Sequence, residues 1–159
     1  MSTGHPISLG SDGAWVVHGS GMDELALHGS NRVVVLEGAR IGAFAFDAEA
    51  VGLPARLEDA IAGGGAAENA AALLRMLGGE TGAYRDTVLL NAGAALCMAA
   101  GAGISGAMFG RDTGAGPDEI EELVPPLAAI RDGIVRAARA IDDGSALAVL
   151  HAAHGTASR

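Results

Sequence analysis

Two β-rich runs in the first third of the chain are the feature that most narrows its possible folds. They extend from Arg32 to Leu36 and from Arg40 to Phe46, and Glu37-Gly38-Ala39 separates them. Phenylalanine alternates with alanine in the second run, as in a half-buried strand, and a short glycine-containing connection is typical of a β-hairpin. We therefore expect an antiparallel hairpin here. A further short buried strand is expected from Ala14 to Val17.

The rest of the chain is dominated by helical patterns. The clearest predicts a helix from Ala66 to Leu77, with one apolar stripe and with Gly78-Gly79 as its end. Further helices are expected from Thr87 to near Gly101 or Gly103 with Asp86 as N-cap, from Leu127 to Ile141, and from Ser145, as a cap, to His154. Short helical turns are expected at Leu57 to Ala62 and at Pro117-Asp118-Glu119. These elements predict one α/β domain over residues 1–159, with short strands and a hairpin packed against several helices.

The composition limits how the core of this domain can pack and which kinds of partner it can bind. A chain of 159 residues can bury a sizeable core, but alanine and glycine supply much of its apolar content. A core so poor in aromatic side chains must pack small residues closely, as helices that touch through alanine do. The formal net charge of -9 and the absence of lysine argue against a nucleic-acid partner, which would need a basic face. Without lysine, a phosphate must be bound by arginine, backbone N–H groups or a metal.

The longest apolar stretch, Val88 to Gly103, is shorter than the roughly 20 residues of a membrane span, and Asn91 interrupts it. We expect a buried helix whose Asn91 amide is tied by hydrogen bonds to a neighbouring loop; a substrate contact is the alternative. Cys97, the single cysteine, lies in this stretch and is expected to be a small buried hydrophobe. The start of the chain, Met1 to Pro6, lacks the basic and apolar segments of a secretory signal, so we expect a cytoplasmic protein with no membrane partner.

The acidic pair Asp23-Glu24 is the strongest candidate site in the sequence. It ends the glycine-broken run His18 to Glu24, directly after the first expected strand. Adjacent carboxylates at the exit of a strand suit Mg²⁺, which takes one or two protein carboxylates and keeps its other positions for water and for substrate phosphates. The alternative interpretation is a charged turn that is simply solvated.

The glycine run Gly63-Gly64-Gly65 ahead of the helix at Ala66 is a second candidate site. Free N–H groups at the start of a helix attract anions, so this run is compatible with a phosphate cradle. However, the sequence has neither the lysine and hydroxyl of a P-loop nor a dinucleotide-binding fingerprint after a strand. Close backbone packing is therefore the favoured interpretation of these glycines.

An ordered series of segments resembles one enzyme family. The segments are Trp15 to Leu25, the hairpin, Gly52-Leu53-Pro54, Gly63 to Ala70, Arg85 to Ala92 and Ile141 to Ala146. Together they resemble anthranilate phosphoribosyltransferase over roughly Leu9 to Leu150. The resemblance implies an α/β domain of the nucleoside phosphorylase/phosphoribosyltransferase type. It also implies transfer of the phosphoribosyl group of phosphoribosyl pyrophosphate to anthranilate in tryptophan biosynthesis, with Asp23 and Glu24 as the family's acidic pair that binds Mg²⁺.

The sequence also departs from the family pattern. The GTGGD loop that cradles pyrophosphate and the KHGNR-type segment that helps to receive anthranilate do not occur in it. We therefore expect an incomplete domain, its amino-terminal half absent, that cannot assemble the site alone. Gly65 stands where the family usually has aspartate, residues 1–8 are expected to form an irregular start, and residues 104–126, chiefly Gly106 to Pro126, form an inserted loop and helical turn.

Two functional hypotheses from different classes remain open. In the first, the chain is the carboxy-terminal part of the transferase and supplies the Mg²⁺ site to a complementary amino-terminal polypeptide, or within a homodimer. In the second, it is a non-catalytic remnant or interaction module whose exposed sheet edge and helix faces bind a partner or a second copy. A pyrimidine nucleoside phosphorylase, which shares the architecture and also cleaves at ribose C1, ranks last because the acidic pair and the contexts of Asn69 and Asn91 fit it less well.

Overall fold

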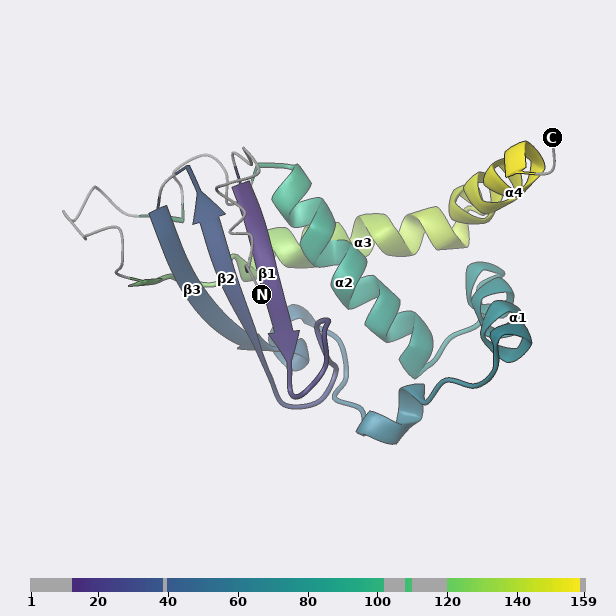
Figure 1. The fold of residues 1–159 in the computed structure, drawn as a ribbon, viewed down its shortest axis with the longest axis horizontal. Helices are drawn as coiled ribbons and strands as arrows, with labels where there is room; N and C mark the ends of the chain where they lie inside the picture. The colour runs from purple at the N-terminus through teal and green to yellow at the C-terminus, as the bar shows by residue number, and fades with distance from the viewer. Residues whose placement is uncertain (1–12, 39, 102–107, 110–119, 158–159) are drawn as a thin grey trace, which may run out of the picture.

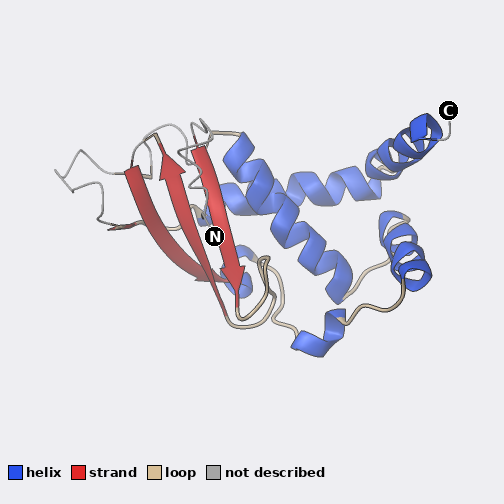
Figure 2. Cartoon of the chain, in the orientation of Figure 1, coloured by secondary structure: helices blue, strands red, loops and turns tan. Residues whose placement is uncertain are grey.

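The computed structural model describes residues 13–38, 40–101, 108–109 and 120–157. A β-sheet lies at one side of the molecule and helices pack against one of its faces (Figure 1, Figure 2). The elements are β1 (Gly13–Gly19), β2 (Ser30–Glu37), β3 (Arg40–Asp47), the 3-10 turns η2 (Ala48–Val51) and η3 (Glu58–Ile61), α1 (Ala66–Leu77), α2 (Ala83–Ala99), β4 (Glu121–Glu122), α3 (Leu127–Asp142) and α4 (Ser145–Ala157). The predicted mixed α/β class is confirmed.

The sheet has the strand order β1-β2-β3-β4. The first three strands are antiparallel, with Trp15 opposite Val35 and Val33 opposite Phe44, so both the predicted first strand and the predicted hairpin are confirmed. Gly38 in the hairpin turn has a φ of 58°, a conformation that only glycine adopts without strain. β4 adds to the far edge of β3 in a parallel direction, which leaves β1 as the other edge of the described sheet.

The core lies between the sheet and helices α2 and α3, each of which has one end beside the sheet and leads away from it in Figure 1. Phe44 at the centre of the sheet is fully buried, and the ring of Trp15 meets it edge-on with centroids 5.4 Å apart. Leu90 of α2 and Ile130 of α3 are fully buried on the helical side. Cys97 is buried as predicted, and this burial raises the pKa of its thiol, so the neutral form is favoured.

Helices α2 and α3 make the most extensive contact of any two helices in the described fold because glycines meet where they cross. A Cβ atom added to Gly133 would collide with the backbone carbonyl of Gly93, and one added to Gly93 would lie 2.9 Å from the backbone N of Ile134. The expected close packing through small residues is therefore confirmed, with glycine rather than alanine at the crossing point.

The predicted helices are confirmed in position, but the predicted N-cap of α2 is wrong. The helix starts at Ala83 rather than Thr87, and Gly82 is its N-cap. The backbone N–H of Asp86 donates to the carbonyl of Gly82 at 3.0 Å, which is already a helical bond, so Asp86 lies in the first turn. Its carboxylate instead pairs with Arg56 at 3.1 Å and ties the segment after β3 to this helix.

Ser145 is also not the cap that the sequence suggested. It is the first residue of α4, and its hydroxyl donates to the carbonyl of Ala140 at 3.2 Å. The carboxylate of Asp143 accepts the Ser145 N–H at 2.9 Å, and its interactions with the side chain and then the backbone of Ser145 lower the pKa of Asp143 below its usual range. The side chain of Asp143, two residues upstream, thus accepts a free N–H at the start of α4, which is the role that the sequence suggested for Ser145.

The predicted insertion is part of the core where it is described. Phe109 and Leu123 are buried, and the N–H of Leu123 donates to the carbonyl of Ala43 in β3 at 2.7 Å. Glu121 accepts both Nε and Nη2 of Arg40, whose guanidinium also stacks on the Phe109 ring at 4.6 Å. The described part of the insertion therefore contributes a strand to the sheet. Its predicted helical turn at residues 117–119 and the irregular start at residues 1–8 lie outside the described residues.

Candidate functional site

A tight turn at the end of β1 carries the chain into the acidic pair. The N–H of Met22 donates to the carbonyl of Gly19 at 2.8 Å, and Ser20 and Gly21 between them have φ values of 42° and 92°. Positive φ at two consecutive positions is characteristic of a hairpin-type turn, and glycine at the second position reduces the strain. The glycine-broken run therefore reverses the chain and presents the residues that follow.

Asp23 and Glu24 are both exposed, whereas the next residues, Leu25, Ala26 and Leu27, are buried. Among the described residues, neither carboxylate forms an ion pair. The adjacent carboxylates thus project from a segment that is anchored in the core by the residues directly after them. The structure keeps them accessible to solvent and to a ligand.

Two asparagine side chains hold the backbone of this anchor. Asn91 on α2 accepts the N–H of Leu25 at 3.0 Å and donates to its carbonyl at 2.9 Å. Asn31 at the start of β2 accepts the N–H of Ala26 at 2.7 Å and donates to its carbonyl at 3.0 Å. The predicted link from Asn91 to a neighbouring loop is confirmed, and the loop is the acidic one. The role of Asn31 was not predicted; an asparagine at the first positions of a β-rich run was the only signal for it.

Gly19 allows the acidic loop to fold back on the end of β1. A Cβ atom at this position would lie 2.5 Å from Oδ1 of Asn31 and 2.7 Å from the carbonyl of Glu24. Real side-chain atoms do not approach so closely, so only glycine permits this arrangement. The acidic loop, from here on residues 19–26, is therefore fixed by a close backbone contact as well as by the two asparagines.

Glu24 lines a pocket of about 350 Å³ on the side of α2, together with Thr87 and Asn91. Ile61 and Tyr84 also line this pocket, and both residues line a second, larger one of about 480 Å³. The two pockets are therefore neighbours that share a wall. Glu24 of the acidic loop lines the smaller pocket only, whereas the start of α2 lines both.

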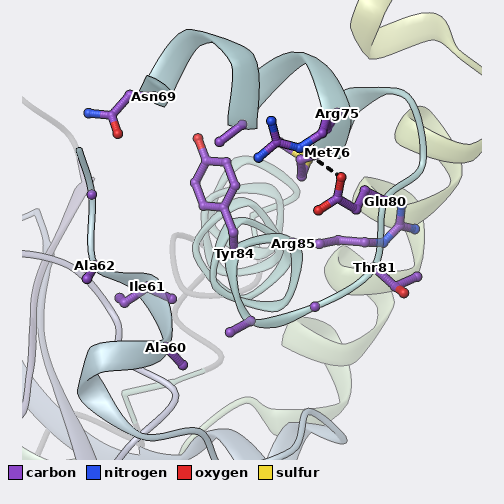
Figure 3. A pocket seen from close by; sticks show the side chains of 14 residues that line it. Ala60, Ile61, Ala62, Asn69, Arg75, Met76, Glu80, Thr81, Tyr84 and Arg85 are labelled. Atoms are coloured by element: carbon purple, nitrogen blue, oxygen red, sulfur yellow. Dashed lines mark ion pairs between the residues drawn. The ribbon is translucent and has the colours of Figure 1, made fainter. Parts of the chain in front are cut away.

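The larger pocket lies between η3, the glycine run, α1 and the start of α2. Figure 3 shows the ring of Tyr84 standing between Ile61 and Arg75, while Nε of Arg75 pairs with Oε2 of Glu80 at 3.0 Å. This pocket combines a tyrosine, an ion pair and apolar side chains. Arg85 lines the same pocket: its Nη2 pairs with Asp142 at 2.7 Å, and its buried Nη1 has no hydrogen-bond partner among the described residues.

The N–H groups of the glycine run are occupied by side chains of the helix that follows. The N–H of Gly64 donates to Oδ1 of Asn69 at 2.9 Å, and the N–H of Gly65 donates to Oε2 of Glu68 at 2.7 Å. Asn69 also donates to the carbonyl of Gly64 at 3.0 Å. The glycines therefore serve close packing around the helix start, which was the favoured interpretation, and these two N–H groups are not free for a phosphate.

The donor set at the acidic pair fits Mg²⁺. Both candidate groups are hard carboxylate oxygens on adjacent exposed residues, and Mg²⁺ commonly binds one or two such groups while it keeps several waters or substrate oxygens. Within the described part of the chain, no three or more His, Cys, Asp or Glu side chains gather in a way that could hold a metal ion. An ion at Asp23 and Glu24 would thus need water or a phosphorylated ligand to complete its coordination.

None of the helices in the described ranges has both the length and the apolar character needed to cross a membrane.

Comparison with known proteins identifies the family to which this chain is similar. A model of the glycosyl transferase family, a/b domain, matches residues 7–147. Curated relatives include anthranilate phosphoribosyltransferase of Mesorhizobium japonicum, 44% identical over 143 residues that make up 90% of this chain and 35% of the relative. The same enzyme of Phenylobacterium zucineum is 42% identical over 142 residues, which are 89% of this chain and 35% of the relative. The chain thus spans about a third of the length of these relatives.

The solved structures that match this chain include two of anthranilate phosphoribosyltransferase. Anthranilate phosphoribosyltransferase from Thermus thermophilus matches with a TM-score of 0.61 and 33% identity, over 87% of this chain and 34% of that one. The enzyme from Saccharomyces cerevisiae in complex with 4-fluoroanthranilate has a TM-score of 0.68 at 22% identity, over 91% of this chain and 35% of that one, a likeness that shows the fold alone. Since the family model covers most of the sequence, this chain belongs to the glycosyl transferase family through its a/b domain.

Proposed function

We propose that this chain supplies the Mg²⁺-binding portion of a phosphoribosyltransferase that transfers the phosphoribosyl group of phosphoribosyl pyrophosphate to the amine of anthranilate. The family membership and the name shared by the relatives support the reaction. The chain spans about a third of those relatives, and the proposed site also uses residues of the portion that it does not match. Asp23 and Glu24 are the residues assigned to the metal.

The reaction explains why a carboxylate pair is useful. The bond from ribose C1 to pyrophosphate breaks, the anthranilate nitrogen bonds to C1 and loses a proton, and pyrophosphate leaves with the electron pair of the broken bond. Mg²⁺ held by Asp23 and Glu24 would supply a positive charge beside the departing pyrophosphate. The protein's own contribution is to hold the two carboxylates in place, so that their position is set before the substrate arrives.

The observation that carries this proposal is the geometry of the acidic loop. Asp23 and Glu24 are exposed and unpaired among the described residues, yet Leu25 beside them is fixed by burial and by Asn91. A charged turn that served only solubility would not need this anchorage. An accessible carboxylate pair on a fixed support is the arrangement that a shared protein and substrate metal site requires.

The direct test is reconstitution of transfer activity. The chain is mixed with the segment of the Mesorhizobium japonicum relative that it does not match, and loss of anthranilate fluorescence is followed with phosphoribosyl pyrophosphate and Mg²⁺. We expect turnover with the pair and at least a tenfold loss, about 1.4 kcal/mol, in the double variant Asp23→Asn/Glu24→Gln. The matched control is Asp47→Asn/Glu49→Gln, which changes two other exposed acidic residues. A complex that forms but makes no product contradicts the proposal.

A second candidate, a non-catalytic interaction module, has its own support in exposed apolar side chains. Val16 in the edge strand β1 is 57% exposed, and Val149 on α4 is 69% exposed. An unpaired edge strand with an apolar surface is a template for another chain. This candidate predicts that Asp23→Asn/Glu24→Gln changes nothing measurable. It also predicts that Val16→Arg abolishes self-association or partner binding in sedimentation velocity experiments.

A further inference from the structure

Two consecutive residues after the acidic pair are each held at both backbone polar groups by one asparagine side chain. Asn91 binds the N–H and the carbonyl of Leu25, and Asn31 binds those of Ala26. An amide side chain that meets a residue in this way imitates a neighbouring β-strand, because it offers one acceptor and one donor side by side. The acidic loop therefore has a fixed backbone directly beside Glu24.

Asn91 is itself fixed by the helix that carries it. Its side-chain nitrogen also donates to the carbonyl of Thr87 one turn earlier, at 3.0 Å, so its rotamer is set by α2. Helix α2 in turn packs on α3 through Gly93 and Gly133. Through Asn91, the backbone of Leu25 is thus attached to the most tightly packed pair of helices. The Leu25 side chain is also buried, with only 1% of its surface exposed.

We propose that Asn91 is a positioning residue for the metal site: it sets the affinity of Asp23 and Glu24 for a divalent cation by fixing the backbone of Leu25. The inference rests on the proposed function, in which these two carboxylates hold Mg²⁺. Groups that orient metal ligands without touching the metal typically change its affinity by about 10- to 100-fold when removed. Asn91 and Glu24 also line the same pocket, so the amide is close to the site that it supports.

The chain contains a matched control for this idea. Asn69 on α1 forms the same two-point contact with the backbone of Gly64, at 2.9 and 3.0 Å. This contact involves the glycine run and not the acidic loop. Removing the Asn69 amide therefore removes an equivalent structural contact without a link to Asp23 and Glu24.

The experiment compares wild-type protein, Asn91→Leu, Asn69→Leu and Asp23→Asn/Glu24→Gln. Mn²⁺ binding is measured by the electron paramagnetic resonance signal of the free ion, with Mn²⁺ as the only added ligand and at a temperature where each variant is folded by circular dichroism. We expect Asn91→Leu to weaken Mn²⁺ binding about tenfold or more. Asn69→Leu should bind as wild type does. Equal affinities of folded Asn91→Leu and wild type overturn the inference.

Amide hydrogen exchange in the wild-type protein keeps the inference testable even where Asn91→Leu does not fold. The amides of Leu25 and Ala26 should exchange more slowly than those of Asp23 and Glu24, and exchange of Leu25 as fast as an unstructured amide overturns the inference. The acidic-pair variant separates the two proposals. If it binds Mn²⁺ as wild type does, the proposed function fails and this inference fails with it; if it loses binding and Asn91→Leu does not, only this inference fails.

Discussion

Helices α1 and α2 are neighbours in the sequence, but they contribute very differently to the fold. α1 has the cleaner apolar stripe, yet Met76 is its single buried residue, and Leu74 on the stripe is 48% exposed. α2 shows no clear stripe because it is apolar or small on several sides, and it buries side chains such as Leu90 along its whole length. In Figure 1, α2 lies near the sheet and α1 lies at the far end of the molecule.

The contrast between α1 and α2 shows that a periodic apolar pattern predicts the presence of a helix better than it predicts where that helix packs. A helix that is apolar all round must be central, whereas a single stripe needs only one neighbour and that neighbour can be small. The candidate site follows the same division, because Asn91 of α2 binds both backbone polar groups of Leu25 in the acidic loop. Stability and ligand positioning should both depend on α2 much more than on α1.

The largest contrast should come from truncating one leucine on each helix. Leu90→Ala removes a fully buried side chain and should lower the free energy of unfolding by about 2–5 kcal/mol through lost burial and a cavity. Leu74→Ala removes a half-exposed one and should change it by less than about 0.5 kcal/mol. Urea denaturation followed by circular dichroism measures both. Equal effects of the two variants would break the comparison.

The next largest effect should come from the crossing of α2 and α3. Gly133→Ala places a methyl group against the backbone of Gly93, and overpacking of this kind should lower the free energy of unfolding by about 1–3 kcal/mol. Ala128→Leu adds more volume to the same helix at an exposed position and serves as the control. A shift in urea midpoint for the glycine variant no greater than for the control would show that the helices are not in close contact.

Two ion pairs allow a smaller contrast. The Arg85 side chain on α2 is 9% exposed and pairs with Asp142 at 2.7 Å, whereas Arg75 and Glu80 are both more than half exposed. Asp142→Asn leaves a buried guanidinium without its counter-charge and should lower stability by about 1–2 kcal/mol, a value reduced by the exposure of Asp142. Glu80→Gln should have an effect of about 0–1 kcal/mol. Thermal unfolding of both variants in low salt measures the difference, and a larger loss for Glu80→Gln contradicts it.

The smallest predicted effect concerns the junction of α3 and α4. Hydrogen bonds from Ser145 lower the pKa of Asp143, so the folded state favours the ionised carboxylate. The resulting stabilisation is present above the ordinary carboxyl pKa of 3.8 and is lost as the pH falls through the lowered value. Asp143→Asn should therefore be slightly less stable than wild type at neutral pH and equally stable in strong acid. A difference that grows on acidification, measured by urea midpoints, would reverse this assignment.

The sequence predicted elements whose signals are local. The signals for β3, for the turn at Gly38 and for helix α1 depend on neighbouring residues, and these three elements are confirmed, although Met76 is the single buried residue of α1. Asp86 is a good capping residue and so predicts a start of α2 at Thr87, but Gly82 is the N-cap and Arg56 pairs with the Asp86 carboxylate. Capping preferences decide a helix start only where no other partner competes for the side chain.

The parts that the sequence did not predict depend on contacts between distant residues. The pairing of β4 with β3 requires Glu121 to meet Arg40, 81 positions away in the sequence. The acidic pair was recognised from two adjacent residues and a family resemblance, but its support by Asn31 becomes visible only when β2 lies beside the loop. A candidate ligand pair is thus readable from sequence, whereas the groups that hold it in place are not.

The central claim is that Asp23 and Glu24 together bind a divalent cation on a fixed loop. The most direct measurement is a Mn²⁺ titration of wild type, Asp23→Asn, Glu24→Gln and the double variant, monitored by electron paramagnetic resonance with and without phosphoribosyl pyrophosphate. We expect either single substitution to weaken Mn²⁺ binding and the double variant to abolish it, and we expect phosphoribosyl pyrophosphate to tighten binding only while both carboxylates are present. Wild type and double variant with the same Mn²⁺ affinity would contradict the central claim.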